Sequence, residues 1–261
     1  VDIVIGDLRD QDLVAKVVAG CDFVLHQAAI PSVTRSVAEP VITHDVNVNG
    51  TFGLFQAAKE AGVQRVVFAG SSAVYGDSEV LPKVETMRAS PLSPYALHKI
   101  AGEYYGSVFT GLYGLDVVTL RYFNVFGPYQ DPASEYSAVI PKFVTRMLDG
   151  RAATIFGDGL QTRDFCHIDN VIEANLAACT APNAAGNAYN IACGERISLL
   201  DLIEQINAVL GTDIPPEFGE PRPGDIEHSV ADIDAARRDL GYTAGVNLRE
   251  GLRRTIDWYR G

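Results

Sequence analysis

The sequence is short of positive charge. Its 21 Lys and Arg residues stand against 33 Asp and Glu residues, which gives a formal net charge of -12 at pH 7. Nucleic acids and anionic membranes attract basic surfaces, so the acidic excess argues against both as partners. An anionic small molecule would need a local group of arginines instead.

Long apolar runs and patterned cysteines are lacking as well. No uninterrupted apolar stretch reaches the roughly 20 residues that span a membrane, and the first residues carry no signal-peptide pattern. The cysteines show no metal-ligand spacing; they are Cys21, Cys166, Cys179 and Cys193. We therefore expect no metal, no membrane segment, and reduced thiols in a cytoplasmic protein.

What the sequence does contain is an alternation of apolar, strand-like runs with helical stretches. The strand-like runs cover residues 1–6, 21–30, 65–71, 117–123 and 187–192, and helices are expected at residues 10–20, 41–61, from 94 onward and 169–179. Continuous apolar runs are typical of parallel strands buried on both faces. The alternation predicts an α/β fold with a doubly wound parallel sheet and a ligand at the carboxyl ends of its strands.

One stretch points to chemistry. The run RVVFAGSS ends in Ser71 and Ser72, and the later run PLSPYALHK places Tyr95 and Lys99 four residues apart, on one face of a helix. A Lys ammonium about 5 Å from the phenol supplies roughly 3 kcal/mol at an effective dielectric of about 20. Lowering a tyrosine pKa from about 10 to about 7 needs about 4 kcal/mol. Lys99 is thus predicted to be nearly sufficient to make Tyr95 a base, with a further cation at the site supplying the remainder and Ser71 relaying the proton.

These residues, in this order, resemble the extended short-chain dehydrogenase/reductase family of NAD-dependent epimerases and dehydratases. Within it the chain most resembles the nucleotide-sugar 4-epimerases that act on UDP-glucose or UDP-N-acetylglucosamine. The resemblance implies NAD as cofactor, a UDP-hexose as substrate and a homodimer. It also implies a 4-keto intermediate formed by removing hydride from carbon 4, with Ser71, Tyr95 and Lys99 as catalytic residues.

The same resemblance implies two domains. Residues 1–123 plus about 164–192 would form a Rossmann-like NAD-binding domain, and residues 124–163 plus 193–261 a nucleotide-sugar-binding lobe. A length of 261 residues is enough for two closely packed units of this kind.

Cofactor contacts are implied at the carboxyl ends of the strands. Asp7 and Leu8 would lie beside the adenine, although Asp7 could instead cap the next helix. Small residues at a strand end let a pyrophosphate approach the backbone, which gives Ala28 and Ala29 this role. Tyr122 would lie near the nicotinamide, together with Tyr95 and Lys99. His26 has no acidic or nucleophilic partner in sequence, so we interpret it as a packed, hydrogen-bonded residue.

Substrate contacts are implied mostly in the second lobe. Asn124 would hold the sugar diphosphate, and the two fork-shaped cations expected on the pyrophosphate are Arg163 and Arg222. Asp225 would meet the nucleotide ribose. Nearer the sugar, the resemblance implies Ser32, Ser72 and Ser229.

Ser229 bears on which sugar is accepted. Family members restricted to UDP-glucose and UDP-galactose tend to carry a bulky Tyr at the matching place, whereas members that take N-acetylated sugars carry a small residue. A Tyr that clashes with an acetamido group would cost far more than the roughly 1–3 kcal/mol of one misfit methylene. The small Ser229 therefore predicts that the N-acetylated pair is accepted along with UDP-glucose and UDP-galactose.

The family begins with a strand and a Gly-rich turn that cradle the cofactor pyrophosphate, and nothing of that kind precedes Val1. We expect the sequence to lack the first two strands, roughly 50–70 residues by the usual length of two βα units. The activity would then belong to the full-length protein, and this stretch alone would be impaired. The residue that separates NAD from NADP lies in the expected missing part.

The sequence leaves other functions open. Dehydratases of the family place Asp and Glu directly after the first hydroxyl residue of the strand-end motif, where this chain has Ser72 and Ala73. A nucleotide-sugar 4-reductase needs only the Ser, Tyr and Lys set together with an exchanging cofactor. An alternative from another functional class is a non-catalytic protein that binds a nucleotide sugar. The presence of Ser71, Tyr95 and Lys99 together argues against it.

Overall fold

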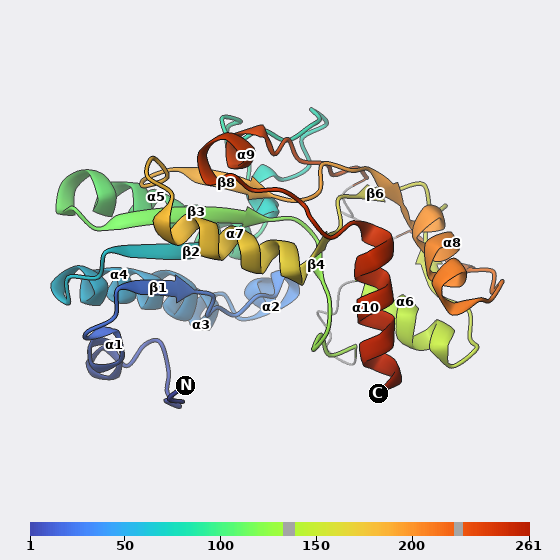
Figure 1. Cartoon of the computed structure of the whole chain (residues 1–261), viewed down its shortest axis with the longest axis horizontal. Helices are drawn as coiled ribbons and strands as arrows, with labels where there is room; N and C mark the ends of the chain where they lie inside the picture. The colour runs from blue at the N-terminus through green and yellow to red at the C-terminus, as the bar shows by residue number, and fades with distance from the viewer. Residues whose placement is uncertain (133–138, 222–226) are drawn as a thin grey trace.

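A single parallel sheet forms the centre of the molecule (Figure 1). This computed structural model describes residues 1–132, 139–221 and 227–261. The sheet has the order β1 (Phe23–His26), β2 (Arg65–Ser71), β3 (Asp116–Tyr122) and β8 (Ala188–Ile191), and each neighbouring pair is parallel. The predicted parallel α/β sheet is confirmed, as is the return of residues 187–192 to it.

Helices cover both faces of the sheet because alternate residues of the strands point to opposite sides. Val67, Val118 and Leu120 pack in a core that includes α7 (Ile168–Thr180). Val66 and Phe68 belong to a second core on the other face. The helices of that face are α1 (Gln11–Val18), α2 (Val33–Ala38), α3 (Pro40–His44), η1 (Asp45–Gly50), α4 (Thr51–Glu60), α5 (Pro94–Val108) and η3 (Phe109–Tyr113).

A smaller lobe with its own core lies beyond the carboxyl ends of β2 and β3 (Figure 1). It contains β4 (Val125–Phe126), α6 (Val139–Leu148), β5 (Thr154–Phe156), β6 (Thr162–Arg163), β7 (Cys166–His167), β9 (Ile197–Ser198), α8 (Leu199–Leu210), β10 (Glu217–Gly219) and α10 (Leu248–Arg260). Between α8 and α10, α9 (Asp234–Leu240) returns to pack against β8. The short 3-10 turn η2 (Ser72–Tyr75) follows β2.

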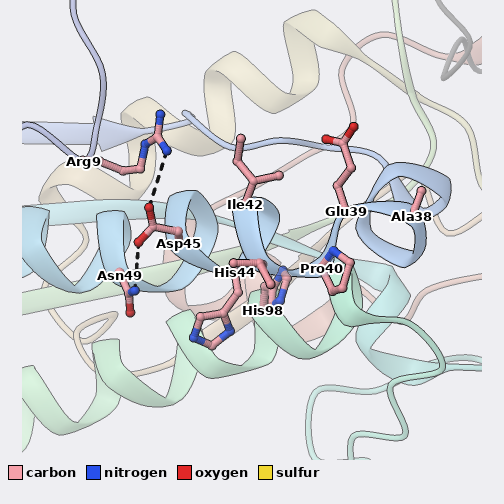
Figure 2. Close-up of a pocket in the computed structure, with 10 residues that line it drawn as sticks. Arg9, Ala38, Glu39, Pro40, Ile42, His44, Asp45, Asn49 and His98 are labelled. Atoms are coloured by element: carbon pink, nitrogen blue, oxygen red, sulfur yellow. Dashed lines mark hydrogen bonds and ion pairs between the residues drawn. The ribbon is translucent and has the colours of Figure 1, made fainter.

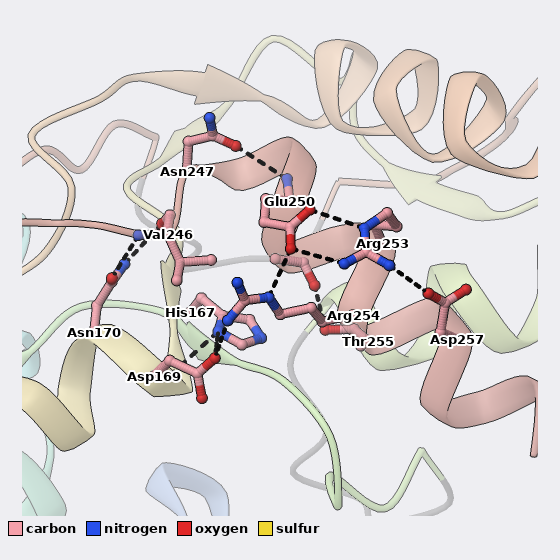
Figure 3. Close-up of polar contacts among 11 residues, drawn as sticks. His167, Asp169, Asn170, Val246, Asn247, Glu250, Arg253, Arg254, Thr255 and Asp257 are labelled. Atoms are coloured by element: carbon pink, nitrogen blue, oxygen red, sulfur yellow. Dashed lines mark hydrogen bonds and ion pairs between the residues drawn. The ribbon is translucent and has the colours of Figure 1, made fainter.

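Polar side chains join α7 to the start of α10 (Figure 3). The Asn170 side chain donates to the carbonyl of Val246 over 2.8 Å and accepts the N–H of the same residue over 2.9 Å. Arg254 pairs with Asp169 at 2.6 Å. The two-way bond to a main-chain amide fixes both distance and orientation, so the last helix is held to the sheet domain at a defined angle.

The start of the chain differs from the prediction. Residues 1–6 form no strand ladder within the described residues, and Ile3 and Ile5 are largely exposed. A strand forms only where a neighbour supplies hydrogen bonds, and here β1 pairs with β2 alone. For the same reason β1 is not buried on both faces as predicted, and Phe23 and Leu25 are exposed.

Side-chain hydrogen bonds show which residue caps the first helix and what His26 does. Asp10, rather than Asp7, caps α1 by accepting the N–H of Leu13. His26 is buried, and its Nε2 lies 2.9 Å from the Thr51 hydroxyl. Burial, with a smaller effect of the Lys99 charge, lowers the pKa of His26 to about 3. The interpretation of His26 as a packed, hydrogen-bonded residue is confirmed.

Among the described helices, none has both the length and the apolar character needed to cross a bilayer.

Candidate active site

Ser71 stands at the carboxyl end of β2, where the strand turns into η2. Its hydroxyl accepts the N–H of Ala73 over 3.2 Å, which fixes the side chain at the start of the turn. The preceding Gly70 has no space for a side chain: a Cβ would lie 2.8 Å from Thr119 and 3.0 Å from the carbonyl of Leu120. Ser71 is thus held in place by a tightly packed strand end.

Tyr95 is brought to Ser71 by the way α5 begins. Ser93 caps the helix by accepting the N–H of Ala96, and Pro94 occupies the first turn, where its missing N–H is harmless. The N–H of Tyr95, which no helical carbonyl can accept, donates to the hydroxyl of Ser36 over 3.0 Å. The Ser71 hydroxyl lies close enough to the Tyr95 phenol to act on its pKa.

Lys99 lies one helical turn further on and is 5% exposed. Its ammonium donates to the carbonyl of Ala69 over 2.7 Å and lies 5.9 Å from the centre of the Tyr95 ring and 5.2 Å from that of Phe68. Burial lowers the pKa of Lys99 to about 8, so it remains a cation at neutral pH. The structure therefore brings the three residues predicted from the motif together at one strand end.

The pKa of Tyr95 does not follow the prediction. Burial raises the pKa of Tyr95, and the nearby Ser71 hydroxyl opposes the rise only in part. Lys99 was expected to lower it, but the ammonium is directed at the Ala69 carbonyl and lies over the phenol ring. A phenolate at this position requires positive charge beyond that of Lys99.

The predicted adenine contacts surround a single hollow. Asp7, Leu8 and Ala28 line a mostly apolar space of about 400 Å³ together with side chains of α1 and Leu54. The Asp7 carboxylate accepts the main-chain N–H of Arg9 and two bonds from its guanidinium, which lower the pKa of Asp7 to about 2. An apolar space with a fixed carboxylate at its edge fits a flat aromatic ring that carries an amino group. Ala29, next in the chain, is half-buried.

Tyr122 belongs to a network that the sequence did not reveal. Its hydroxyl accepts a bond from the Asn175 amide over 2.9 Å and donates to Gln27 over 3.1 Å. Gln27 in turn donates to Asn175 over 3.0 Å. Gln27 directly precedes Ala28 and Ala29, and a polar residue before two small ones at a strand end could have marked it as a site residue. Asn175 lies inside a helix, where the sequence pattern does not distinguish it.

On the substrate side, Asn124 is held at the end of β3 with a positive φ of 24°. Its side chain donates to the carbonyl of Asp164 over 3.2 Å, and its own carbonyl accepts the N–H of Cys166 over 3.3 Å. The Asp164 carboxylate accepts main-chain N–H groups from Cys193, Gly194 and Ala231. Asn124 thus lies at the junction of sheet and lobe.

The remaining predicted substrate residues fall into three groups. Arg163 and Ser229 lie on adjoining segments: the N–H of Ser229 donates to the carbonyl of Thr162, and Arg163 donates to the carbonyl of Glu227. Ser32 is buried as the N-cap of α2, and Ser72 follows Ser71 in η2. Arg222 and Asp225 lie outside the described residues.

A separate hollow of about 920 Å³ lies on the side of α5 turned towards α3 (Figure 2). His98 lines it from α5 and His44 from α3, with their rings 5.3 Å apart. Lys99, the next residue on α5, instead points to β2. Helix α5 therefore keeps the side chains of the motif on its sheet-facing side, away from this hollow.

Comparison with known proteins identifies the family. Residues 1–192 match the model of the NAD dependent epimerase/dehydratase family. The chain belongs to this family. A putative UDP-glucose 4-epimerase of Methanocaldococcus jannaschii is 37% identical over 261 residues, which cover 99% of this chain and 84% of that protein.

Two solved structures of the family are also similar. The UDP-N-acetylglucosamine 4-epimerase of Methanobrevibacter ruminantium M1, in complex with UDP-N-acetylmuramic acid, has a TM-score of 0.95 and 40% identity, covering 99% of this chain and 82% of that one. The UDP-glucose 4-epimerase of Thermus thermophilus, in complex with NAD, has a TM-score of 0.87 and 36% identity, covering 98% and 84%. The predicted family and Rossmann-like fold are confirmed.

The buried Lys99 yields a prediction on stability. Because its pKa is lowered from 10.5 to about 8, the folded state binds the proton less tightly than the unfolded state. Below pH 8 the cost of keeping Lys99 protonated in the folded state lowers the free energy of unfolding by about 3 kcal/mol. This cost disappears as the pH rises from 8 to 10.5, so stability increases over that range. Lys99→Met removes the penalty and loses a hydrogen bond worth about 1 kcal/mol. We expect the variant to be more stable than wild type in urea at pH 7, and the difference to shrink by pH 10.

The control is Lys16→Met, which removes an exposed ammonium near the end of α1. It should leave the unfolding free energy unchanged at both pH values. A Lys99→Met protein less stable than wild type at pH 7 would contradict the account of Lys99.

Proposed function

We propose that this protein catalyses the NAD-dependent 4-epimerisation of a UDP-hexose. The observation that carries the proposal is the arrangement of Ser71 and Tyr95 at one strand end, with the Lys99 ammonium 5.9 Å from the centre of the Tyr95 ring. This is an acid–base group for an alcohol carbon, and it stands where ligands bind in parallel sheets. Relatives named as UDP-sugar 4-epimerases, at 37–40% identity over nearly the whole chain, support the choice of reaction.

In this proposal each residue acts at the sugar 4-hydroxyl. Ser71 orients the hydroxyl, and Tyr95 takes its proton. NAD, when bound, would supply the hydride acceptor and the positive charge that Lys99 alone does not provide. Tyr95 would return the proton to the sugar oxygen after the 4-keto sugar has turned its other face.

The residues around the strand ends would hold the ligands. Asp7, Leu8 and Ala28 suit the adenine, and Ala29 lets the pyrophosphate approach the chain. Tyr122, fixed by Gln27 and Asn175, would stand beside the nicotinamide. Asn124, Arg163, Arg222 and Asp225 would take the UDP part, with Ser32, Ser72 and Ser229 near the sugar.

A 4,6-dehydratase is the second candidate, because relatives with that name reach 34% identity. Elimination needs an acid and a base beside the sugar. Ser72 and Ala73, the residues after Ser71, carry neither, so the epimerase is preferred. A 4-reductase and a non-catalytic UDP-sugar binder are the further alternatives, and the first test below separates the binder from the enzymes.

We propose that the active form is a cytoplasmic homodimer formed through α5. Leu97, Tyr104 and Val108 of this helix and Leu112 of η3 follow one another at helical spacing on one exposed face. Phe52 of α4 extends the face by contacting Tyr105. An apolar stripe on two neighbouring helices suits a second copy of itself across a twofold axis.

The first prediction concerns the base. Tyr95→Phe in the full-length protein removes the hydroxyl that accepts the proton and leaves the ring in place. We expect turnover to fall by about 100-fold or more. Binding of NAD and of UDP-sugar, measured by calorimetry, should stay within a few-fold of wild type. Substantial turnover in the Phe variant would remove Tyr95 from the mechanism, and wild type that binds both ligands without turnover would favour the binder.

The second prediction concerns the sugar. Wild type should interconvert UDP-N-acetylglucosamine with UDP-N-acetylgalactosamine as well as the non-acetylated pair, since Ser229 leaves room for an acetamido group. Ser229→Tyr should lose the acetylated pair and keep the other, whereas the matched Ser229→Ala control should keep both. The proposal for Ser229 fails if wild type ignores the acetylated pair, or if the Tyr variant turns it over equally well.

The third prediction concerns assembly. Sedimentation velocity should give a dimer for wild type and a monomer for Tyr104→Lys with Leu112→Lys, because two ammonium groups cannot be buried in an apolar contact without partners. Leu160→Lys places the same charge on an exposed leucine of the second lobe and should leave the dimer intact. A monomeric wild-type protein would exclude this interface.

A further inference from the structure

The backbone of Tyr95 is held by a side chain that the proposed reaction does not use. The N–H of Tyr95, in the first turn of α5, donates to the hydroxyl of Ser36 in α2 over 3.0 Å. Ser36 is 0% exposed, and its hydroxyl donates to the carbonyl of Val33 over 2.6 Å. Because that bond uses the only hydrogen of the hydroxyl, a lone pair of its oxygen is left to accept the Tyr95 N–H.

This bond acts in the part of α5 that the helix itself holds least. The N–H groups of a first helical turn have no carbonyl partner within the helix, so they depend on acceptors from outside it. Ser93 supplies one acceptor, for the N–H of Ala96. Ser36 supplies another at Tyr95 itself, from a position 59 residues earlier in the chain. Without the Ser36 hydroxyl, the residue that carries the base would lose this bond to α2.

Ser36 has a fixed position because the segment that leads into α2 is itself fixed. The Asn47 side chain, in η1, accepts the N–H of Ile30 over 2.8 Å and donates to the carbonyl of the same residue over 3.1 Å. Ser32 then caps α2 by accepting the N–H of Arg35, and its carbonyl accepts the N–H of Ser36 over 3.0 Å. The position of Ser36 is therefore set by the chain that leaves the end of β1.

The same stretch of chain contains proposed ligand contacts. Ala28 and Ala29 are proposed to lie at the cofactor and Ser32 near the sugar, a few residues before Ser36. A base must lie within hydrogen-bond reach of the proton that it takes, and a misplacement of about 1 Å can cost about 100-fold in rate. The bond from Tyr95 to Ser36 thus joins the base to the stretch that would hold the ligands.

We propose that Ser36 is a positioning residue for Tyr95, an inference that rests on the proposed function. The Ser36 hydroxyl keeps the first turn of α5 against α2, so that the phenol reaches the 4-hydroxyl of a sugar held beside Ser32. Lys99, one turn later, fixes the same helix to β2 through the carbonyl of Ala69. Two bonds to different elements then restrict the movement of the phenol relative to the sugar. Loss of the Ser36 bond therefore impairs the chemical step more than it impairs binding.

The first experiment measures turnover and binding of the Ser36→Ala variant of the full-length protein. With UDP-glucose or UDP-N-acetylglucosamine, whichever wild type converts faster, kcat should fall about tenfold or more while KM stays within about twofold of wild type. Turnover is expressed per NAD bound, so that an unfolded fraction does not contribute. Thr34→Ala is the matched control, because it removes an exposed hydroxyl from the same helix. Its kcat should equal that of wild type.

The second experiment determines whether the loss of turnover acts through Tyr95. In the Tyr95→Phe background, Ser36→Ala should lower the remaining turnover by less than about twofold, because the base that Ser36 positions is absent. A general loss of structure would instead lower turnover by the same factor in both backgrounds. Equal factors, or a folded Ser36→Ala variant whose kcat stays within about twofold of wild type, would overturn the proposal.

A third measurement needs no turnover. Exchange of the Tyr95 amide hydrogen, followed by NMR on protein with isotope-labelled tyrosine, should be faster in Ser36→Ala than in wild type and unchanged in Thr34→Ala. The Tyr95 signal is assigned by its absence from the Tyr95→Phe variant. An exchange rate that Ser36→Ala leaves unchanged would overturn the role of Ser36. Wild type with slow exchange at Tyr95 and no epimerase activity would contradict the proposed function instead.

Discussion

The buried ammonium of Lys99 is the interaction on which the candidate site depends. It bonds the carbonyl of Ala69, two residues before Ser71, and lies on the same helix as Tyr95. This buried bond holds α5 against the end of β2, and the buried ion pair between Arg121 of β3 and Glu103 of α5 holds the same helix to the neighbouring strand.

The burial that accompanies this bond explains why the site opposes folding. Burial lowers the pKa of Lys99 and raises that of Tyr95, because the charged form of each group is disfavoured away from water. A ligand that brings the opposite or compensating charge into the site would therefore stabilise the ionised form of these groups. The structure is therefore better suited to a phenolate that forms beside a bound cation than to one that stands in the free protein.

A second buried charge organises the other half of the molecule. The Asp164 carboxylate receives three main-chain N–H groups, from Cys193, Gly194 and Ala231. Burial raises the pKa of Asp164 to about 6, and these bonds oppose the rise. Because the donors come from two segments, residues 193–194 after β8 and Ala231 before α9, this carboxylate joins both segments to the chain after β4. The main chain of Asp164 also contacts Asn124, so the geometry of the proposed UDP site depends on this residue.

Features that depend on neighbouring residues in the sequence could be predicted, whereas contacts between residues far apart in the sequence could not. Ser71, Tyr95 and Lys99 could be predicted because strand ends and helix spacing are local features, and so could the parallel sheet. The Gln27–Asn175–Tyr122 network joins residues far apart in sequence and leaves no periodic trace. The pKa of Tyr95 was predicted wrongly because spacing gives the distance of Lys99 but neither its hydrogen bond to Ala69 nor the burial. Residues 1–6 have strand composition, but a strand also requires a partner.

The most direct test of the central claim is the fate of the hydrogen on carbon 4 of the sugar. UDP-N-acetylglucosamine carrying deuterium at this carbon is incubated with the full-length protein and NAD, and both epimers are analysed by mass spectrometry. If hydride leaves carbon 4 and returns to it within one active site, deuterium remains at that carbon in both epimers. Deuterium exchanged for solvent hydrogen, or a product that has lost water, would contradict the account.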